Sequence, residues 1–238
     1  MDRIREGGLR TAFFGGSFDP PHLGHLAIAR AARTALALDK VLFAPVGAQP
    51  LKPRGSTADF ADRVAMTRLA IDGEPGFEVS LLDAPGGSGA PNYTLETLLR
   101  LRAESPGAEL FCLMGADSFL SLWHWHRGEE IPFAASLIVA SRPGEDLNHL
   151  AQAWPEGWTL DSKPCATLPP SGEPVSCYAI RTAAGRIAPF YVLPGLHVEI
   201  SATQIREQIR AAASGLAGGR DVLPASVANY IRSHRLYT

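Results

Sequence analysis

Two histidines follow a glycine pair in the segment Gly15-Gly16-Ser17-Phe18-Asp19-Pro20-Pro21-His22-Leu23-Gly24-His25. The glycines end an apolar run, where they let backbone N–H groups approach a phosphate without a Cβ in the way. A helix that begins here adds free N–H donors and the positive end of its dipole. His22 and His25 lie three positions apart, so both imidazoles can donate to phosphate oxygens, and a bound phosphate would raise their pKa values. The segment therefore predicts a phosphate site at which these histidines stabilise charge.

The two histidines could also have roles unrelated to phosphate. His22 could cap the helix while His25 is a core histidine with its own hydrogen bonds. The pair could instead bind zinc, although no third ligand is evident nearby in the sequence. The spacing is neither the dinucleotide GxGxxG pattern nor a Walker P-loop, because no GK[ST] follows.

A second anion site is predicted in the segment Ile200-Ser201-Ala202-Thr203-Gln204-Ile205-Arg206. Ser201 or Thr203 can act as the N-cap of a helix whose first N–H groups are free for an anion. Arg206 follows one turn later, and its guanidinium can donate two parallel hydrogen bonds to phosphate oxygens. The alternative is an ordinary capped helix with a surface arginine.

Short apolar runs alternate with stretches of helical periodicity, which predicts an α/β fold with a doubly wound, mainly parallel sheet. The predicted strands are 9–14, 41–46, 78–82, 110–114, 137–140, 190–193 and 198–200, and the predicted helices are 22–38, 59–71, 94–104, 118–123, 202–213 and 224–234. Ligands of such sheets bind at the carboxyl ends of the strands, where the glycine pair lies. We expect a single domain over residues 1–238. It would hold a Pro-rich irregular insertion at 155–190, with a hairpin near 175–187, and a C-terminal helical part at 200–238.

Composition limits the classes of partner. A net charge of −2 gives no basic field for nucleic acid. No signal peptide or membrane-spanning segment is evident, so we expect a cytoplasmic protein. Cys112 is expected in the core, and a bridge between Cys165 and Cys177 is possible but not favoured in a reducing compartment. The sequence predicts no oligomeric state.

Two of these segments carry a resemblance to a known superfamily. GSFDPPHLGH resembles the (H/T)xGH signature of the nucleotidyltransferases, and ISATQIR is similar to their ISSTxIR segment, with Ala202 in place of the second serine. The resemblance implies that ATP phosphates are bound without a covalent enzyme intermediate. It assigns catalytic roles to His22, His25 and Arg206, and phosphate binding to Gly15, Gly16, Ser17, Phe18, Lys52, Ser201 and Thr203.

Four further segments resemble the nicotinate-nucleotide adenylyltransferases, namely PNYTLETL, GADS, WHWH and SRPG. The resemblance implies that Tyr93, Thr94 and Trp125 bind nicotinate, with Trp123 as the alternative tryptophan. It places Gly115, Asp117 and Arg142 on the adenosine side. From the residues alone, Thr94 is also a candidate N-cap of helix 94–104, and Asp117 a candidate N-cap of helix 118–123.

The resemblance implies an enzyme that transfers AMP from ATP to nicotinate mononucleotide, giving deamido-NAD and pyrophosphate. Mg²⁺ would be bound mainly through the ATP phosphates, with no protein ligand for the metal. One departure concerns the acceptor, because Leu51 stands where the family usually has histidine, while Lys52 can still meet a phosphate. Two alternatives follow: transfer to nicotinamide mononucleotide or phosphopantetheine on the same fold, or a nucleotide-binding module without catalysis.

Overall fold

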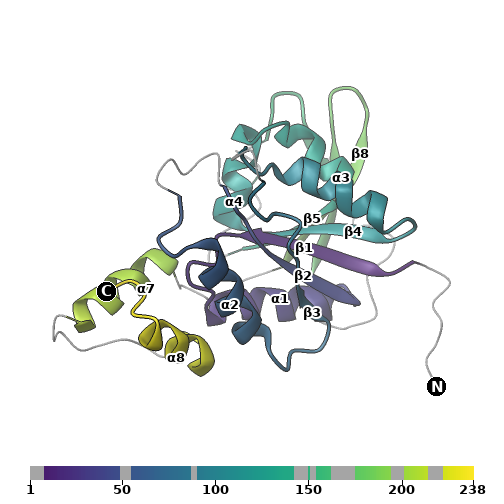
Figure 1. The fold of residues 1–238 in the computed structure, drawn as a ribbon. Coiled ribbons are helices and arrows are strands. Elements are labelled where there is room, and N and C mark those ends of the chain that lie inside the picture. The colour runs from purple at the N-terminus through teal and green to yellow at the C-terminus, as the bar shows by residue number, and fades with distance from the viewer. Residues whose placement is uncertain are drawn as a thin grey trace, which may run out of the picture. The chain divides into compact units, whose positions relative to one another are not determined.

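The computed structural model describes residues 8–48, 55–86, 90–141, 150, 154–161, 175–193, 201–213 and 222–238. Within those ranges the strands are β1 (Arg10–Gly16), β2 (Lys40–Pro45), β3 (Phe77–Val79), β4 (Glu109–Gly115), β5 (Ser136–Ala140), β6 (Thr159–Asp161), β7 (Ser176–Arg181) and β8 (Ile187–Leu193). They form one sheet in the order β3-β2-β1-β4-β5-β8-β7-β6 (Figure 1). The helices are α1 (Leu23–Ala35), α2 (Phe60–Ile71), α3 (Thr94–Glu104), α4 (Ala116–Ser121), α5 (Ile131–Ala134), α7 (Ala202–Ala213) and α8 (Ala225–Ser233), with short 3-10 turns at Leu122–His124 and Gly128–Glu130.

The chain divides into two compact units. Unit 1 comprises Met1–Phe14, Ile28–Leu42 and Tyr93–His197, and unit 2 comprises Gly15–Ala27, Phe43–Asn92 and Val198–Thr238. Strands β1 and β2 each begin in unit 1 and end in unit 2. That the chain acts as a single domain stays a prediction.

Three parallel strand pairs lie mainly in unit 1. β4 pairs in parallel with β1 and with β5, and β5 pairs in parallel with β8. The residues of β4 from Leu110 to Met114 are all buried, as expected of a parallel strand covered on both faces. Helices α4 and α5 pack against these strands, and α3 packs against α5. The predicted mainly parallel α/β sheet is confirmed.

The Pro-rich region contains more regular structure than we expected. Strand β7 pairs antiparallel with both β6 and β8, and Thr182 and Gly185 form the turn between β7 and β8. The predicted hairpin is therefore present, but the prediction of an irregular insertion over 155–190 was wrong for these strands. Ile180 lies opposite Ala188 in the pair formed by β7 and β8, and alternation places Phe190 on the same face, where all three are buried. Proline usually interrupts a strand, yet Pro189 lies within β8 opposite Ala179.

The cysteines differ in part from expectation. Cys112 is buried in the core, as predicted. Cys177 is disulfide-bonded, whereas the sequence did not favour a bridge. Cys165 lies outside the described residues.

Unit 2 contains α2, α7 and α8, and α8 lies against α2 (Figure 1). Asp59 caps α2 by accepting from the backbone N–H of Asp62 at 2.8 Å. Two hydroxyl groups of α8 bind α2: Ser226 Oγ donates to the carbonyl of Leu69, and Tyr230 Oη donates to Asp62 Oδ1, both at 2.9 Å. Helices α2, α7 and α8 agree with the predicted ranges to within one residue. By contrast, α1 ends at Ala35 rather than at residue 38, because Ala37 takes a left-handed conformation with φ 46°.

Candidate active site

The turn after β1 is built around a buried phenylalanine. Phe18 has φ 47°, a conformation that is uncommon outside glycine and costs on the order of 1–2 kcal/mol. Its ring packs against Phe43 and meets the ring of His25 edge-on, with centroids 5.6 Å and 5.0 Å away. A Cβ on Gly16 would stand 3.3 Å from this ring, so the glycine allows the chain to fold tightly over Phe18. The main chain turns sharply at the point where the sequence predicted phosphate binding.

The side chains of His22 and His25, which follow this turn in the chain, stack on each other. Helix α1 begins at Leu23, so His22 directly precedes it rather than forming part of it. The two imidazole rings stack with their centroids 3.7 Å apart. The backbone N–H of His22 donates to Nδ1 of His25 at 3.2 Å. Since Nδ1 accepts this bond, the neutral ring of His25 carries its proton on Nε2, which makes Nε2 its donor atom.

Burial keeps both imidazoles neutral near pH 7 in the protein without ligand. It lowers the pKa of His22, which is 7% exposed, to about 4. Burial, and secondarily the neighbouring His22, lowers the pKa of His25. Among the described residues, no group hydrogen-bonds to the buried Nδ1 of His22. An unpaired buried nitrogen costs about 1–3 kcal/mol, which argues against a purely structural role for His22.

We expect stability to fall as the medium becomes acidic. Unfolded His22 binds a proton near pH 6.5 and folded His22 only near pH 4, so the unfolded chain takes up more protons between these values. The stabilisation that neutral His22 provides is complete above the pKa of its unfolded state, and it is lost as the pH falls toward the pKa of its folded state. His22 alone should lower the free energy of unfolding by about 2 kcal/mol between pH 7 and pH 5. Urea denaturation of the wild type and of His22→Gln measures this, and an equally steep fall in the variant would contradict it.

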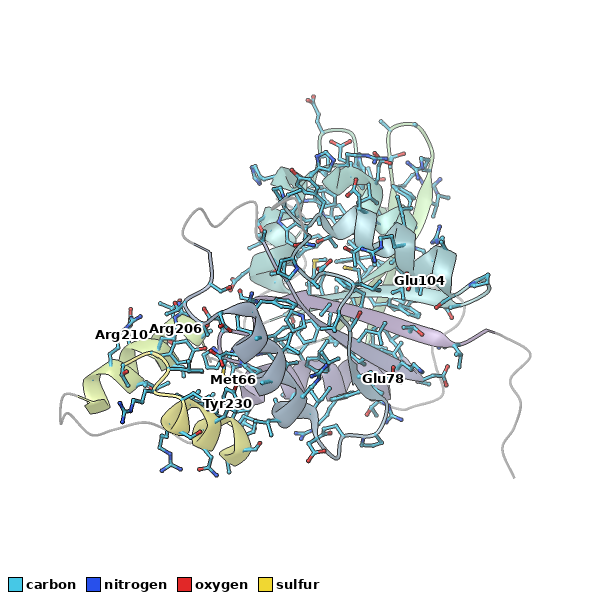
Figure 2. The ribbon with its side chains drawn as sticks, viewed as in Figure 1. Met66, Glu78, Glu104, Arg206, Arg210 and Tyr230 are labelled. Carbon is cyan, nitrogen blue, oxygen red and sulfur yellow. The ribbon has the colours of Figure 1, made fainter. Side chains whose placement is uncertain are left out.

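Arg206 reaches the same turn from α7. Its Nη1 donates to the backbone carbonyl of Asp19 at 2.7 Å, and its Nη2 donates to Thr203 Oγ1 at 3.1 Å. The side chain is 18% exposed, and Figure 2 shows it on α7. The structure thus brings Arg206 to the turn that leads into the histidine pair, within unit 2. Thr203 lies inside α7 and is not its N-cap, whereas Ser201 directly precedes the helix.

Three residues that the sequence did not single out hold this turn. Asp19, 3% exposed, accepts from the backbone N–H groups of Thr57 and Ala58 at 2.6 and 3.0 Å, and from Tyr237 Oη at 2.7 Å. Arg63, 2% exposed, donates from Nη1 to the carbonyl of Ser17 at 2.8 Å. The only signal in the sequence was the position of Asp19 within the motif, because Arg63 and Tyr237 lie far away along the chain.

Unit 1 contains the residues expected to bind nicotinate. The ring of Tyr93 lies against that of His126, with centroids 4.3 Å apart. Helix α3 begins at Thr94 with Tyr93 as its N-cap, so the prediction of Thr94 as N-cap was wrong. Trp125 donates from Nε1 to Ser121 Oγ at 3.2 Å. Trp123 packs against Phe119, Trp154 and Trp158, which favours Trp125 as the tryptophan that meets a ligand.

The residues expected on the adenosine side follow β4 in unit 1. Gly115 is the N-cap of α4, and a Cβ there would meet nothing within 4 Å. Asp117 is exposed and lies in the first turn of α4, whose N-cap is Gly115, so its alternative role as an N-cap was wrong. Lys52, Leu51 and Arg142 lie outside the described residues.

No described helix has the length and apolar character needed to cross a membrane.

Comparison with known proteins places the chain in a family. Residues 13–208 match the family model described as "Cytidylyltransferase-like". A "Probable nicotinate-nucleotide adenylyltransferase" of Geobacter metallireducens is 36% identical over 97% of this chain and 99% of its own length. A protein of the same name from Laribacter hongkongensis is 40% identical over 96% of this chain and 94% of its own length.

A solved structure agrees with this at the level of the fold. The Plasmodium falciparum nicotinic acid mononucleotide adenylyltransferase complexed with NaAD has a TM-score of 0.66 and 15% identity, over 96% of this chain and 97% of that one. At that identity the likeness shows a shared Rossmann-like fold, while the sequence relatives show descent. The chain belongs to the nicotinate-nucleotide adenylyltransferase family.

Proposed function

We propose that this protein transfers AMP from ATP to nicotinate mononucleotide, giving deamido-NAD and pyrophosphate. The observation that carries the proposal is the turn at Phe18 and Asp19, which leads into two stacked imidazoles and holds the guanidinium of Arg206 on its backbone. In a member of this family, such a group of donors suits the phosphates of ATP. NAD biosynthesis is the process that this reaction serves.

The proposed reaction is an in-line displacement. A phosphate oxygen of nicotinate mononucleotide attacks the α-phosphorus of ATP, the bond to the bridging oxygen breaks, and pyrophosphate leaves with that electron pair. No protein nucleophile takes part, so rate enhancement comes from positioning and from charge stabilisation. His25 Nε2 and His22 donate to phosphate oxygens on which negative charge develops. A bound phosphate reverses the effect of burial and raises the pKa of both imidazoles.

Further donors surround the phosphates in this proposal. Backbone N–H groups of the turn after β1 hold one side, and the side chain of Arg206 holds another. The phosphate-binding residues are Gly15, Gly16, Ser17, Phe18, Lys52, Ser201 and Thr203.

For the residues that bind nicotinate and adenosine, we propose the roles that the family resemblance implies. The first N–H groups of α3, at Tyr93 and Thr94, suit the carboxylate of nicotinate. The indole face of Trp125 suits its electron-poor ring. Gly115, Asp117 and Arg142 bind the adenosine of ATP.

Magnesium enters with ATP as part of the substrate. No group of three or more His, Cys, Asp or Glu side chains suited to a metal occurs among the described residues. The carboxylate of the turn, on Asp19, already accepts three hydrogen bonds. We expect Mg²⁺ to be held through phosphate oxygens and water, which is its usual habit. The cytoplasm as the compartment stays a prediction.

A comparison of acceptors tests the function. Purified protein with MgATP should release pyrophosphate fastest with nicotinate mononucleotide. Nicotinamide mononucleotide should be at least about ten-fold poorer in kcat/KM, because the amide leaves carboxylate-binding N–H groups poorly matched. Phosphopantetheine should give no product. Turnover with another acceptor but not with nicotinate mononucleotide would overturn the proposed substrate, and ATP binding in calorimetry without any product would indicate a module without catalysis.

A further inference from the structure

The buried carboxylate of Asp19 joins three segments of unit 2 to the phosphate turn. Its two oxygens accept from the segment that precedes α2, at Thr57 and Ala58, and from the hydroxyl group of Tyr237 after α8. Its Oδ2 also lies 3.9 Å from Nη1 of Arg206. A buried carboxylate without such partners would be strongly unfavourable, so each partner constrains where Asp19 can lie.

Asp19 also positions the guanidinium of Arg206. Arg206 Nη1 donates to the backbone carbonyl of Asp19, while the carboxylate of the same residue lies close to that guanidinium. Any shift of Asp19 therefore moves both the main-chain acceptor and the counter-charge of Arg206. The same shift is passed along the chain to His22, three residues later.

Tyr237 is held in an unusual conformation to make its contact. Its φ is 66°, in the left-handed region, and its side chain is buried, with the residue 6% exposed. Such a conformation in a bulky residue costs on the order of 1–3 kcal/mol and persists where the surroundings enforce it. Burial, and then the nearby Asp19, raises the pKa of the Tyr237 hydroxyl, so it stays a donor throughout the neutral range. Phe18, next to Asp19, is also left-handed, so two uncommon conformations flank one hydrogen bond.

We propose that Tyr237 is a positioning residue of the active site, which acts through Asp19 to orient Arg206 and the turn that carries His22 and His25. The inference rests on the proposed function of that turn. Tyr237 touches no reacting atom in this scheme. Its hydroxyl fixes one oxygen of the carboxylate, which leaves the other oriented toward Arg206 and the backbone N–H group of Thr57.

Tyr237→Phe tests the proposal because it removes the hydroxyl and keeps the ring. A hydrogen bond to a charged group is worth enough for about a ten-fold loss. We expect kcat/KM for ATP to fall by about that factor, mainly through kcat, because misaligned donors affect the transition state more than ground-state binding. The KM for nicotinate mononucleotide should change by less than about two-fold.

Tyr230→Phe is the matched control. Tyr230 also donates its hydroxyl to an aspartate within unit 2, Asp62, at 2.9 Å, but among the described residues the Asp62 carboxylate makes no hydrogen bond to the phosphate turn. This variant should lower thermal stability less than Tyr237→Phe, because its hydrogen bond is more exposed, and should leave kcat/KM for ATP unchanged. Equal losses of activity in the two variants would show that Tyr237 is merely structural.

A double-mutant cycle separates positioning from an independent effect. In the Arg206→Ala background, adding Tyr237→Phe should lower activity by clearly less than about ten-fold, because Arg206, one of the groups that Tyr237 orients, is gone while the histidine turn remains. A full ten-fold loss in that background would overturn the inference, and so would wild-type activity of the single variant.

Amide hydrogen exchange gives a readout that does not depend on turnover. Tyr237→Phe should speed exchange over residues 15–25 relative to wild type, and Tyr230→Phe should not. If the wild type makes no dinucleotide, the proposed function fails, and this exchange alone decides whether Tyr237 positions the turn. Unchanged exchange at the turn would overturn the inference whatever the activity.

Discussion

Replacing His25 by alanine should lower kcat by roughly 10²–10³, the size expected for the loss of one preorganised donor to a transition state. The structure identifies the donor atom, because the backbone N–H of His22 occupies Nδ1 of His25 and leaves the proton on Nε2. Negative charge that shifts onto the phosphate oxygens as the α-phosphorus is attacked would meet this N–H group. Steady-state kinetics with MgATP and nicotinate mononucleotide measures the effect.

Two amide variants distinguish the nitrogens of this ring. His25→Asn can still accept from His22 N–H through Oδ1 but has no donor in the place of Nε2, so its kcat should stay close to that of the alanine variant. His25→Gln can place an amide N–H group near the position of Nε2, and should recover about ten-fold of the loss. Higher activity in the asparagine variant than in the glutamine variant would contradict the assignment. His234→Ala, which removes an exposed imidazole from the end of α8, is the control and should leave kcat unchanged.

Replacing Arg206 by alanine should lower kcat/KM for ATP by about 10²–10³. The guanidinium is held at two points, the carbonyl of Asp19 and the hydroxyl of Thr203, so its remaining N–H groups are oriented before a phosphate arrives. Preorganised charge of this kind contributes several kcal/mol to the stabilisation of phosphoryl-transfer transition states. Stopped-flow or steady-state assays at several ATP concentrations separate the loss in kcat from the rise in KM.

Arg206→Lys distinguishes charge from geometry. Lysine keeps the positive charge but has a single ammonium group, which cannot bind Asp19 and Thr203 as a planar fork does. We expect roughly a ten-fold loss, between the wild type and the alanine variant. Arg210→Ala is the matched control, because it removes the same side chain one turn later on α7 (Figure 2). Full activity of Arg206→Lys would show that charge alone suffices, and a large loss in Arg210→Ala would show that α7 is sensitive throughout.

The local sequence pattern was enough to predict the phosphate turn and most of the helices and strands. The glycine pair, the helix start and the histidine spacing all lie within one short segment, and their chemistry depends on few distant residues. Helices α2, α3, α7 and α8 were predicted for the same reason, since periodicity and capping are local properties.

Features that depend on distant residues were not predictable. Tyr237 hydrogen-bonds to a residue 218 positions earlier, and nothing in the sequence around it indicates that partner. Arg63 looks in the sequence like any exposed arginine of a polar helix face, yet it is buried against Ser17. In the Pro-rich region the hairpin near 175–187 was predicted, but β6 was missed because proline and glycine favour loops locally, while pairing with β7 makes this segment a strand.

The contacts of Asp19 also bear on how the protein acquires its site during synthesis. They join positions separated by 38, 39, 187 and 218 residues along the chain. Contacts of such sequence separation form late, because long stretches of chain must be ordered before they close. A nascent chain that has emerged from the ribosome as far as α2 already contains both histidines, yet it has neither the guanidinium nor the phenol that fixes the turn. Affinity for nucleotide should therefore arise in one late step of folding, and growing chains should not sequester ATP.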